Sequence, residues 1–199
     1  MTVVALKTED PRSNGAVKVE FSDGSSLLLS TDYLNEGELS EGELSSGEEE
    51  AFRFAAACYK AEKIALRLIA RAEQSSLGVT AKLERRGFEA PVAKAVVSCL
   101  LSRNLLDDGR YAELWIRSRL ALRKAPTPQW LLAALRKRGI DRESSRKALD
   151  KALDGETEYA LLLRYLESRG FREKARSSLR AQLKYEGFSS DALERYFDE

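Results

Sequence analysis

Three copies of one short pattern constrain the fold of this chain more than any other feature of its sequence. LERRGF at 83–88, LRKRGI at 135–140 and LKYEGF at 183–188 each place a Leu four residues before a Gly and a large apolar residue directly after it. Helices often end with Gly in the left-handed conformation, which side-chained residues avoid, and the following residue then packs back on the helix. The pattern therefore predicts helix ends at Gly87, Gly139 and Gly187.

These helix ends belong to a larger repeat. Each Gly follows a Tyr by 28 residues, and the position eight residues before each Gly is apolar. The tyrosines are Tyr59, Tyr111 and Tyr159. A helix with the Tyr, a second helix ending at the Gly and a third helix after it make one unit, and units of this size bury their apolar faces by stacking. We predict a mainly α, elongated tandem array of three three-helix units at 47–106, 107–154 and 155–199.

Residues 1–46 have a different pattern and predict a small β-hairpin or sheet of two or three strands, followed by an acidic linker. AVKVEF alternates apolar and polar residues, and SDGS is typical of a tight hairpin turn. Residues 35–50 are rich in Glu, Gly and Ser and predict a mobile connector, which is either a solvated linker or an electrostatic lid over the basic remainder. Ser46 and Glu49 have the spacing of a capping box for the first helix.

Composition argues against an enzyme. The chain has no His, which removes the commonest general base and the commonest metal ligand. Cys58 and Cys99 stand in apolar helical surroundings and are predicted to be reduced core residues. No phosphate-binding Gly loop is present, so we expect no catalytic, cofactor or metal site. The lack of a long apolar run or a secretory signal predicts a cytoplasmic protein that does not enter membranes.

The carboxylates of Asp107 and Asp108 are the pair that most resembles a catalytic or metal-binding motif. They directly precede a predicted helix, where an acidic side chain accepts hydrogen bonds from free backbone N–H groups. We interpret them as helix-capping residues.

Charge is divided unevenly along the chain. Residues 1–50 hold 3 Lys or Arg against 12 Asp or Glu, whereas residues 51–199 hold 30 against 20. This basic excess favours contact with phosphate or with acidic protein, although a row of charges is often only a solvated helix face. The candidate contact residues are Arg85, Arg86, Arg110, Arg117, Arg119, Arg123, Lys124, Arg136, Lys137 and Arg138.

Trp130 is a further candidate contact residue. The repeat aligns it with Gly78 and Ser178, so the shared core does not need a large side chain at this position. Two interpretations remain open: Trp130 fills a gap between units, or it is an exposed anchor beside a basic cluster, as in many interfaces.

A family resemblance adds to these observations. RAEQSSLGVTAKLERRGF, VVSCLLSRNLLDDGRYAELWIRSRL and LLAALRKRGI resemble the RecX family of recombination regulators, most closely from Arg71 to Gly139. The acidic pair with Arg110, Tyr111 and Ala112, together with Gly87 and Gly139, match positions that look fold-defining in that family. The resemblance implies a non-enzymatic regulator that binds the RecA filament and inhibits its ATPase and strand-exchange activities, controlling recombination and DNA repair.

Several points stay open at this stage. We expect a monomer whose partner is the RecA filament, while direct contact with DNA is left undecided. The rival interpretations are a direct nucleic-acid-binding helical-repeat protein and a helical scaffold for acidic proteins. The sequence does not distinguish capping of filament ends from lodging in the groove or promoting disassembly.

Overall fold

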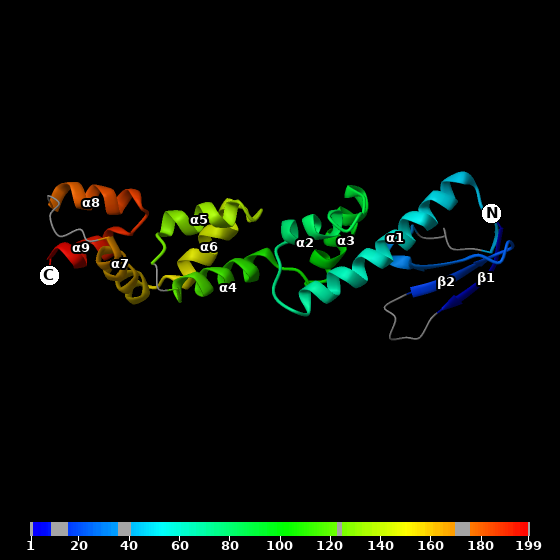
Figure 1. The fold of residues 1–199 in the computed structure, drawn as a ribbon, viewed down its shortest axis with the longest axis horizontal. Helices are drawn as coiled ribbons and strands as arrows, with labels where there is room; N and C mark the ends of the chain where they lie inside the picture. The colour runs from blue at the N-terminus through cyan, green and yellow to red at the C-terminus, as the bar shows by residue number, and fades with distance from the viewer. Residues whose placement is uncertain (1, 9–15, 36–40, 123–124, 170–175, 199) are drawn as a thin grey trace. The chain divides into compact units, whose positions relative to one another are not determined.

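A computed structural model describes residues 2–8, 16–35, 41–122, 125–169 and 176–198. The chain forms two compact units, Met1–Leu106 and Asp107–Glu199. Strands come first along the chain and helices follow to its end, as the ribbon in Figure 1 shows. Within the described residues, every helix is too short or too polar to cross a membrane.

The N-terminal sheet is antiparallel with the order β3-β2-β1-β4 among the described residues. Its strands are β1 (Thr2–Thr8), β2 (Ala16–Phe21), β3 (Ser26–Ser30) and β4 (Gly42–Glu43). In the turn between β2 and β3, Gly24 has φ of 80° and Asp23 accepts hydrogen bonds from Ser25. The sequence predicted two or three strands, and the additional strand β4 comes from the segment predicted as a connector. Its two residues pair with Thr2 and Val3, a long-range contact that the composition of the segment does not indicate.

Helix α1 (Ser46–Ile69) covers the sheet, and Phe52 on α1 shares a core cluster with Val19 and Leu29. The helix starts with a capping box in which Ser45 accepts from the N–H of Glu48 and the Glu48 carboxylate accepts from the N–H of Ser45. The capping box predicted at Ser46 and Glu49 was therefore wrong by one residue. Ser45 with Glu48 and Ser46 with Glu49 both have the sequence spacing of a capping box.

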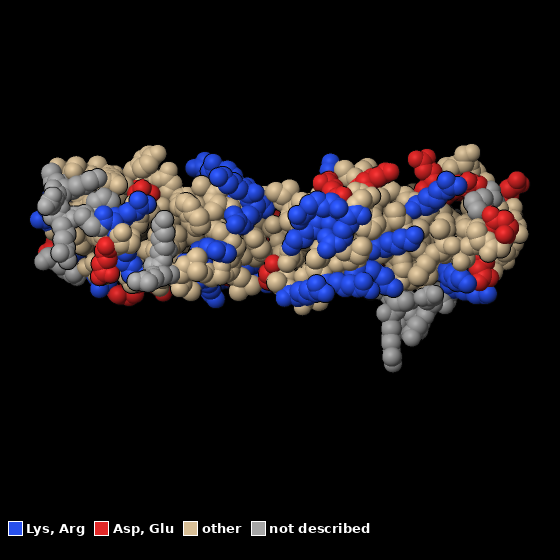
Figure 2. All heavy atoms as spheres, viewed as in Figure 1, with Lys and Arg blue, Asp and Glu red and all other residues tan. Residues whose placement is uncertain are grey.

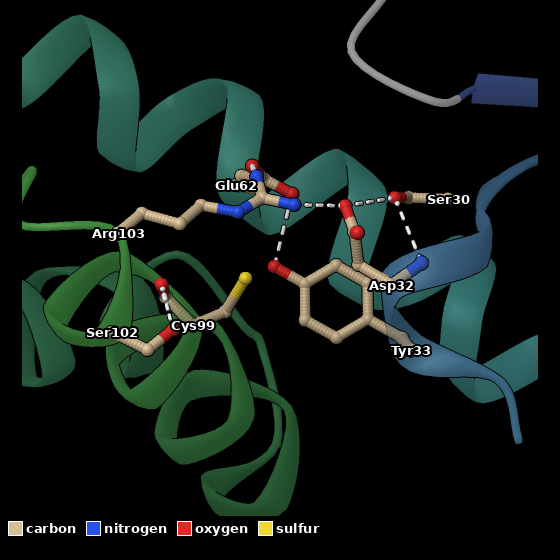
Figure 3. Close-up of polar contacts among 7 residues, drawn as sticks. All are labelled: Ser30, Asp32, Tyr33, Glu62, Cys99, Ser102 and Arg103. Carbon is tan, nitrogen blue, oxygen red and sulfur yellow. Dashed lines mark hydrogen bonds and ion pairs between the residues drawn. The ribbon is translucent and has the colours of Figure 1, made fainter.

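An ionic cluster ties the sheet to the helices of the first unit (Figure 3). Arg103, which ends α3 (Ala90–Ser102), donates to Glu62 on α1 at 3.0 Å and to Asp32 after β3. Glu62 is only 4% exposed, and its second oxygen accepts from the Tyr33 hydroxyl at 2.9 Å. Burial raises the pKa of Tyr33, and the hydrogen bond to Asp32 raises the pKa of Arg103. The guanidinium thus compensates a carboxylate that would be costly to bury alone.

The remaining helices of the first unit are α2 (Ser76–Glu84) and α3, which pack with α1. Cys58, Val79, Leu83 and Val96 are among the buried residues of their shared core. The second unit contains α4 (Asp108–Leu120), α5 (Pro128–Arg136), α6 (Arg142–Ala152), α7 (Gly155–Arg169), α8 (Arg176–Tyr185) and α9 (Ser190–Asp198). One core forms among α4, α5 and α6, and a second among α7, α8 and α9.

Helices α2, α5 and α8 end in the same way. Gly87, Gly139 and Gly187 have φ of 88°, 83° and 91°. In each ending the apolar residue after the Gly donates its N–H to the Leu carbonyl five residues earlier, at 3.2–3.3 Å. The local chemistry that the repeat indicates is therefore what terminates these helices.

Most of the described chain is helical, with a small sheet at the N-terminal end, so the predicted fold class is confirmed. The repeated Tyr differs between copies. Tyr59 is buried with its hydroxyl unpaired, Tyr111 is half-buried, and Tyr159 lies under the guanidinium of Arg195 at 4.1 Å.

Candidate partner-binding surface

Two tryptophans stack on one side of the second unit. Trp115 on α4 is 8% exposed and belongs to the core, whereas Trp130 on α5 is 51% exposed. Their ring centroids are 5.9 Å apart with 23° between the planes. Trp130 therefore keeps one face on a buried ring and offers the rest of its surface to solvent. The structure favours the exposed interpretation of Trp130 over the one in which it fills a gap.

Two arginines flank the buried ring of this pair. The Arg138 guanidinium lies 4.4 Å from the Trp115 ring centroid, and that of Arg119 lies 5.2 Å from it. Arg138 also donates to the carbonyl of Ala134 at 2.7 Å, near the negative end of α5. These contacts hold both guanidinium groups against the Trp115 ring. The Trp115 ring is thereby fixed, and it supports the exposed ring of Trp130.

Beside Trp130 a cavity of about 390 Å³ opens at the connection between α4 and α5. One wall is Tyr165 on α7, whose hydroxyl donates to Glu186 at 3.3 Å. Burial raises the pKa of Tyr165, which keeps the phenol protonated. The Nε of Arg119 is buried without a hydrogen-bond partner. The cavity is lined by Arg119, Leu122, Ala125, Pro126, Thr127, Trp130, Tyr165, Arg169 and Glu186.

A cavity beside an exposed aromatic ring that stacks on a buried one is typical of an interaction hot spot. The exposed indole offers a large apolar surface at small entropic cost, and guanidinium groups at the cavity edge favour an electron-rich or acidic group on the partner. The second unit thus presents a cation–aromatic surface, which we define as Trp130, Trp115, Arg119, Arg138 and Arg169.

The other predicted basic residues have varied surroundings. Arg117, Arg136 and Lys137 are exposed, whereas Arg110 lies 4.0 Å from the Asp107 carboxylate at the start of α4. Asp107 also accepts from the N–H of Arg110 at 2.9 Å, so its position is that of an N-cap, and Asp108 lies in the first turn. Arg123 and Lys124 lie outside the described residues.

Arg85 and Arg86 belong to the first unit and close the end of α2. Arg85 donates to the carbonyl of Ala81 at 3.2 Å, and Arg86 donates to that of Lys82 at 2.9 Å. Both side chains are exposed, and their hydrogen bonds add to the ending of α2, where the carbonyl of Ala81 already accepts from the N–H of Arg85 at 3.2 Å.

A basic row along α1 and the turn after it was missed in the sequence. Lys60, Lys63, Arg67 and Arg71 are exposed, and no ion pair joins them to a carboxylate within the described residues. Figure 2 shows Lys and Arg gathered along much of α1. The signal was present in KAEKIALRLIAR, where basic residues recur every three or four positions and so share one helix face.

The fold defines the class of this protein: a small antiparallel sheet is followed along the chain by consecutive three-helix units. A family model described as RecX, second three-helix domain, matches residues 107–149. The regulatory protein RecX of Treponema pallidum (strain Nichols) is 37% identical over 142 residues, which are 71% of this chain and 86% of that protein. This chain belongs to the RecX family.

Other comparisons agree. The regulatory protein RecX of Syntrophotalea carbinolica is 32% identical over 143 residues, covering 68% of this chain and 92% of that protein. A crystal structure of a regulatory protein RecX has a TM-score of 0.68 at 20% identity and covers 100% of this chain and 99% of that one. The structure of RecX from Lactobacillus salivarius has a TM-score of 0.56 at 21% identity, covering 71% of this chain and 95% of that one. These two structures support the fold.

Proposed function

We propose that this chain binds the filament of the RecA recombinase and inhibits its ATPase and strand-exchange activities, and thereby regulates recombination and DNA repair. Membership of a family of regulatory proteins supports this role. The observation that carries the site assignment is the exposed Trp130, held on Trp115 inside the segment that matches the RecX family model. The chain acts by binding, as a cytoplasmic monomer without a cofactor.

The mechanism rests on several modest contacts along one filament. When one chain contacts more than one RecA subunit, the second contact forms at a high effective concentration and strengthens the first. A chain bound in this way restrains the subunit movements that accompany ATP hydrolysis. In this mechanism the cation–aromatic surface supplies the specific anchor, and the exposed Arg117 and Lys137 of the same unit attract the acidic or phosphate-bearing surface of the complex.

The test is the ATPase activity of RecA on single-stranded DNA as this protein is added. We expect turnover to fall with the added protein, and Trp130→Ala to need about thirtyfold more protein for the same inhibition, because a central aromatic contact contributes about 2 kcal/mol. Tyr185→Ala is the matched control, since Tyr185 is an aromatic residue of the same unit that is 74% exposed and lies outside the surface. Inhibition that is equal for both variants would remove Trp130 from the interface, and no inhibition by the parent protein would refute the function.

A second candidate function, direct binding to nucleic acid, is favoured by the basic row along α1. A row of Lys60, Lys63 and Arg67 on α1, with Arg71 in the turn after the helix, suits a phosphate backbone, because phosphate contacts need positive charge without exact shape. Four such contacts with single-stranded DNA predict that log K falls with log salt at a slope of about −3. Binding to naked DNA with this slope supports the second function, whereas binding that requires RecA supports the first.

A further inference from the structure

The second unit has a groove between α5 and α6, away from the tryptophan pair. Its cavity has a volume of about 710 Å³, within the usual range of ligand-binding pockets. Leu132 on α5 and Ile140 in the turn after it supply apolar lining. The full lining is Leu132, Arg136, Ile140, Arg142, Glu143, Ser145, Arg146 and Lys147.

A second cavity continues the groove. It has a volume of about 520 Å³ and shares Leu132 and Arg146 with the first, so the two are adjacent. It reaches Phe188 and Ser189 in the turn between α8 and α9. Together the cavities provide room for an extended peptide segment rather than a single side chain.

The charges at the first cavity are not balanced. Glu143 is the acidic residue of its lining, and its carboxylate is paired with Lys147 at 2.6 Å. Within the described residues, no carboxylate pairs with the guanidinium of Arg136, Arg142 or Arg146, and all three side chains are exposed. Arg142 and Arg146 are four residues apart on α6 and so lie side by side. Arg forms two parallel hydrogen bonds to a carboxylate, which makes this rim suited to acidic side chains.

The second cavity is less positive than the first, because its lining has Asp150 and Glu158 beside Arg146 and Lys184. Glu158 accepts from the N–H and the hydroxyl of Ser189 at 2.8 and 2.7 Å. The arginine-rich end of the groove is thus the end that attracts carboxylates. This difference orients a peptide along the groove.

We infer that this groove binds a peptide segment of a partner protein in which a large apolar residue is flanked by Asp or Glu. The apolar residue occupies the lining at Leu132 and Ile140, and the carboxylates pair with Arg136, Arg142 and Arg146. A nucleic-acid backbone would pair with the arginines but would leave the apolar lining unfilled, so the mixed lining favours a peptide. The inference goes beyond the proposed function, because it names a separate surface and does not depend on RecA as the partner.

The test uses fluorescence polarisation with the full chain and three short labelled peptides. The first contains Leu among Asp and Glu, the second has Ser in place of Leu, and the third has Asn and Gln in place of Asp and Glu. We expect the first peptide to bind about tenfold more tightly than either of the others. A labelled thymidine oligonucleotide of the same length measures binding to phosphate.

Variants assign the binding to the groove. The double variant Arg142→Ala, Arg146→Ala is expected to weaken binding of the first peptide about tenfold, because it removes two exposed charge pairs. The double variant Lys94→Ala, Arg180→Ala removes the same charge from exposed positions outside the groove and is expected to bind as the parent does. Circular dichroism checks that both variants are folded.

Several results would overturn the inference. Equal loss in the two double variants would mean that only net charge attracts the peptide. Equal binding of the Leu and Ser peptides would remove the apolar lining from the site. A peptide groove would be excluded if no peptide binds. It would then be a phosphate site if the oligonucleotide binds and this binding depends on Arg142 and Arg146. None of these results bears on inhibition of the RecA ATPase, so the two proposals fail separately.

Discussion

Replacement of Gly187 by Ala tests how the last helices of the second unit are held against α5. Gly187 has φ of 91°, and a Cβ added to it would lie 3.1 Å from the backbone N of Gln129. That same N–H donates to the carbonyl of Glu186 at 3.0 Å. A methyl group therefore meets backbone atoms at a junction that also lies next to Trp130.

Gly87 provides the matched control for this substitution. It has φ of 88° in an equivalent helix ending, but an added Cβ there meets nothing within 4 Å. Left-handed backbone costs a side-chained residue about 1–2 kcal/mol, and the reduced entropy of the unfolded chain offsets about 0.4–1 kcal/mol of that. Gly87→Ala should therefore lower the free energy of unfolding by about 1 kcal/mol.

Gly187→Ala has the same backbone cost with two additions. Overpacking against Gln129 costs about 1 kcal/mol or more, and a weakened hydrogen bond to Glu186 costs up to about 1 kcal/mol. We expect a total loss of about 2–3 kcal/mol, at least 1 kcal/mol beyond Gly87→Ala.

Urea unfolding measures both losses. Both tryptophans of the chain, Trp115 and Trp130, lie in the second unit, so their fluorescence reports on Gly187→Ala, while circular dichroism follows Gly87→Ala. Fluorescence should also change in folded Gly187→Ala, because Gln129 directly precedes Trp130. Equal losses for the two variants would refute the reasoning, since the close approach to Gln129 is what separates them.

Three further predictions concern other parts of the molecule. Arg103→Ala leaves Glu62 buried without its cation and should destabilise the first unit by about 2–3 kcal/mol in urea, whereas loss below about 0.5 kcal/mol would contradict an ionic clamp. The hydrogen bond from Ser144 lowers the pKa of Asp141, so this cap stabilises the fold above the unfolded pKa and is lost as pH falls through the folded value. Asp141→Asn should therefore reduce the drop in melting temperature on acidification, and an unchanged drop would exclude this contribution. Burial raises the pKa of Cys58 to about 12, so iodoacetamide should leave Cys58 unmodified in the folded protein by mass spectrometry, and rapid labelling would contradict the packing.

The sequence predicted features that depend on local chemistry. The helix endings at Gly87, Gly139 and Gly187 follow from backbone preference and from contacts within six residues, and the mainly helical class follows from the repeat that contains them. The exact start of α1 was missed because Ser45 and Ser46 each have Glu three positions later. Only the surrounding packing selects between them.

Features that depend on distant residues were not predictable. Glu62 reads as an ordinary surface carboxylate, and its partner Arg103 lies 41 residues away. Arg136, Lys137 and Arg138 are equivalent candidate contact residues in the sequence, but Arg138 packs over Trp115 while its neighbours face solvent. Arg142 and Arg146 became candidate contact residues only because the structure places them in one groove with Leu132 and Ile140. The distribution of charge along the sequence does not show this neighbourhood.

The geometry of α5 explains how one short helix serves both candidate surfaces. Successive residues are rotated by about 100° around a helix axis, so Leu131 and Leu135 form the stripe that is fully buried in the core. Trp130 lies about 100° to one side of Leu131, and Leu132 lies about 100° to the other. The tryptophan pair and the groove therefore occupy opposite flanks of the same buried stripe. No residue lines both surfaces. A substitution on one flank should therefore leave binding at the other surface unchanged. The effects of two such substitutions on the free energy of unfolding should add.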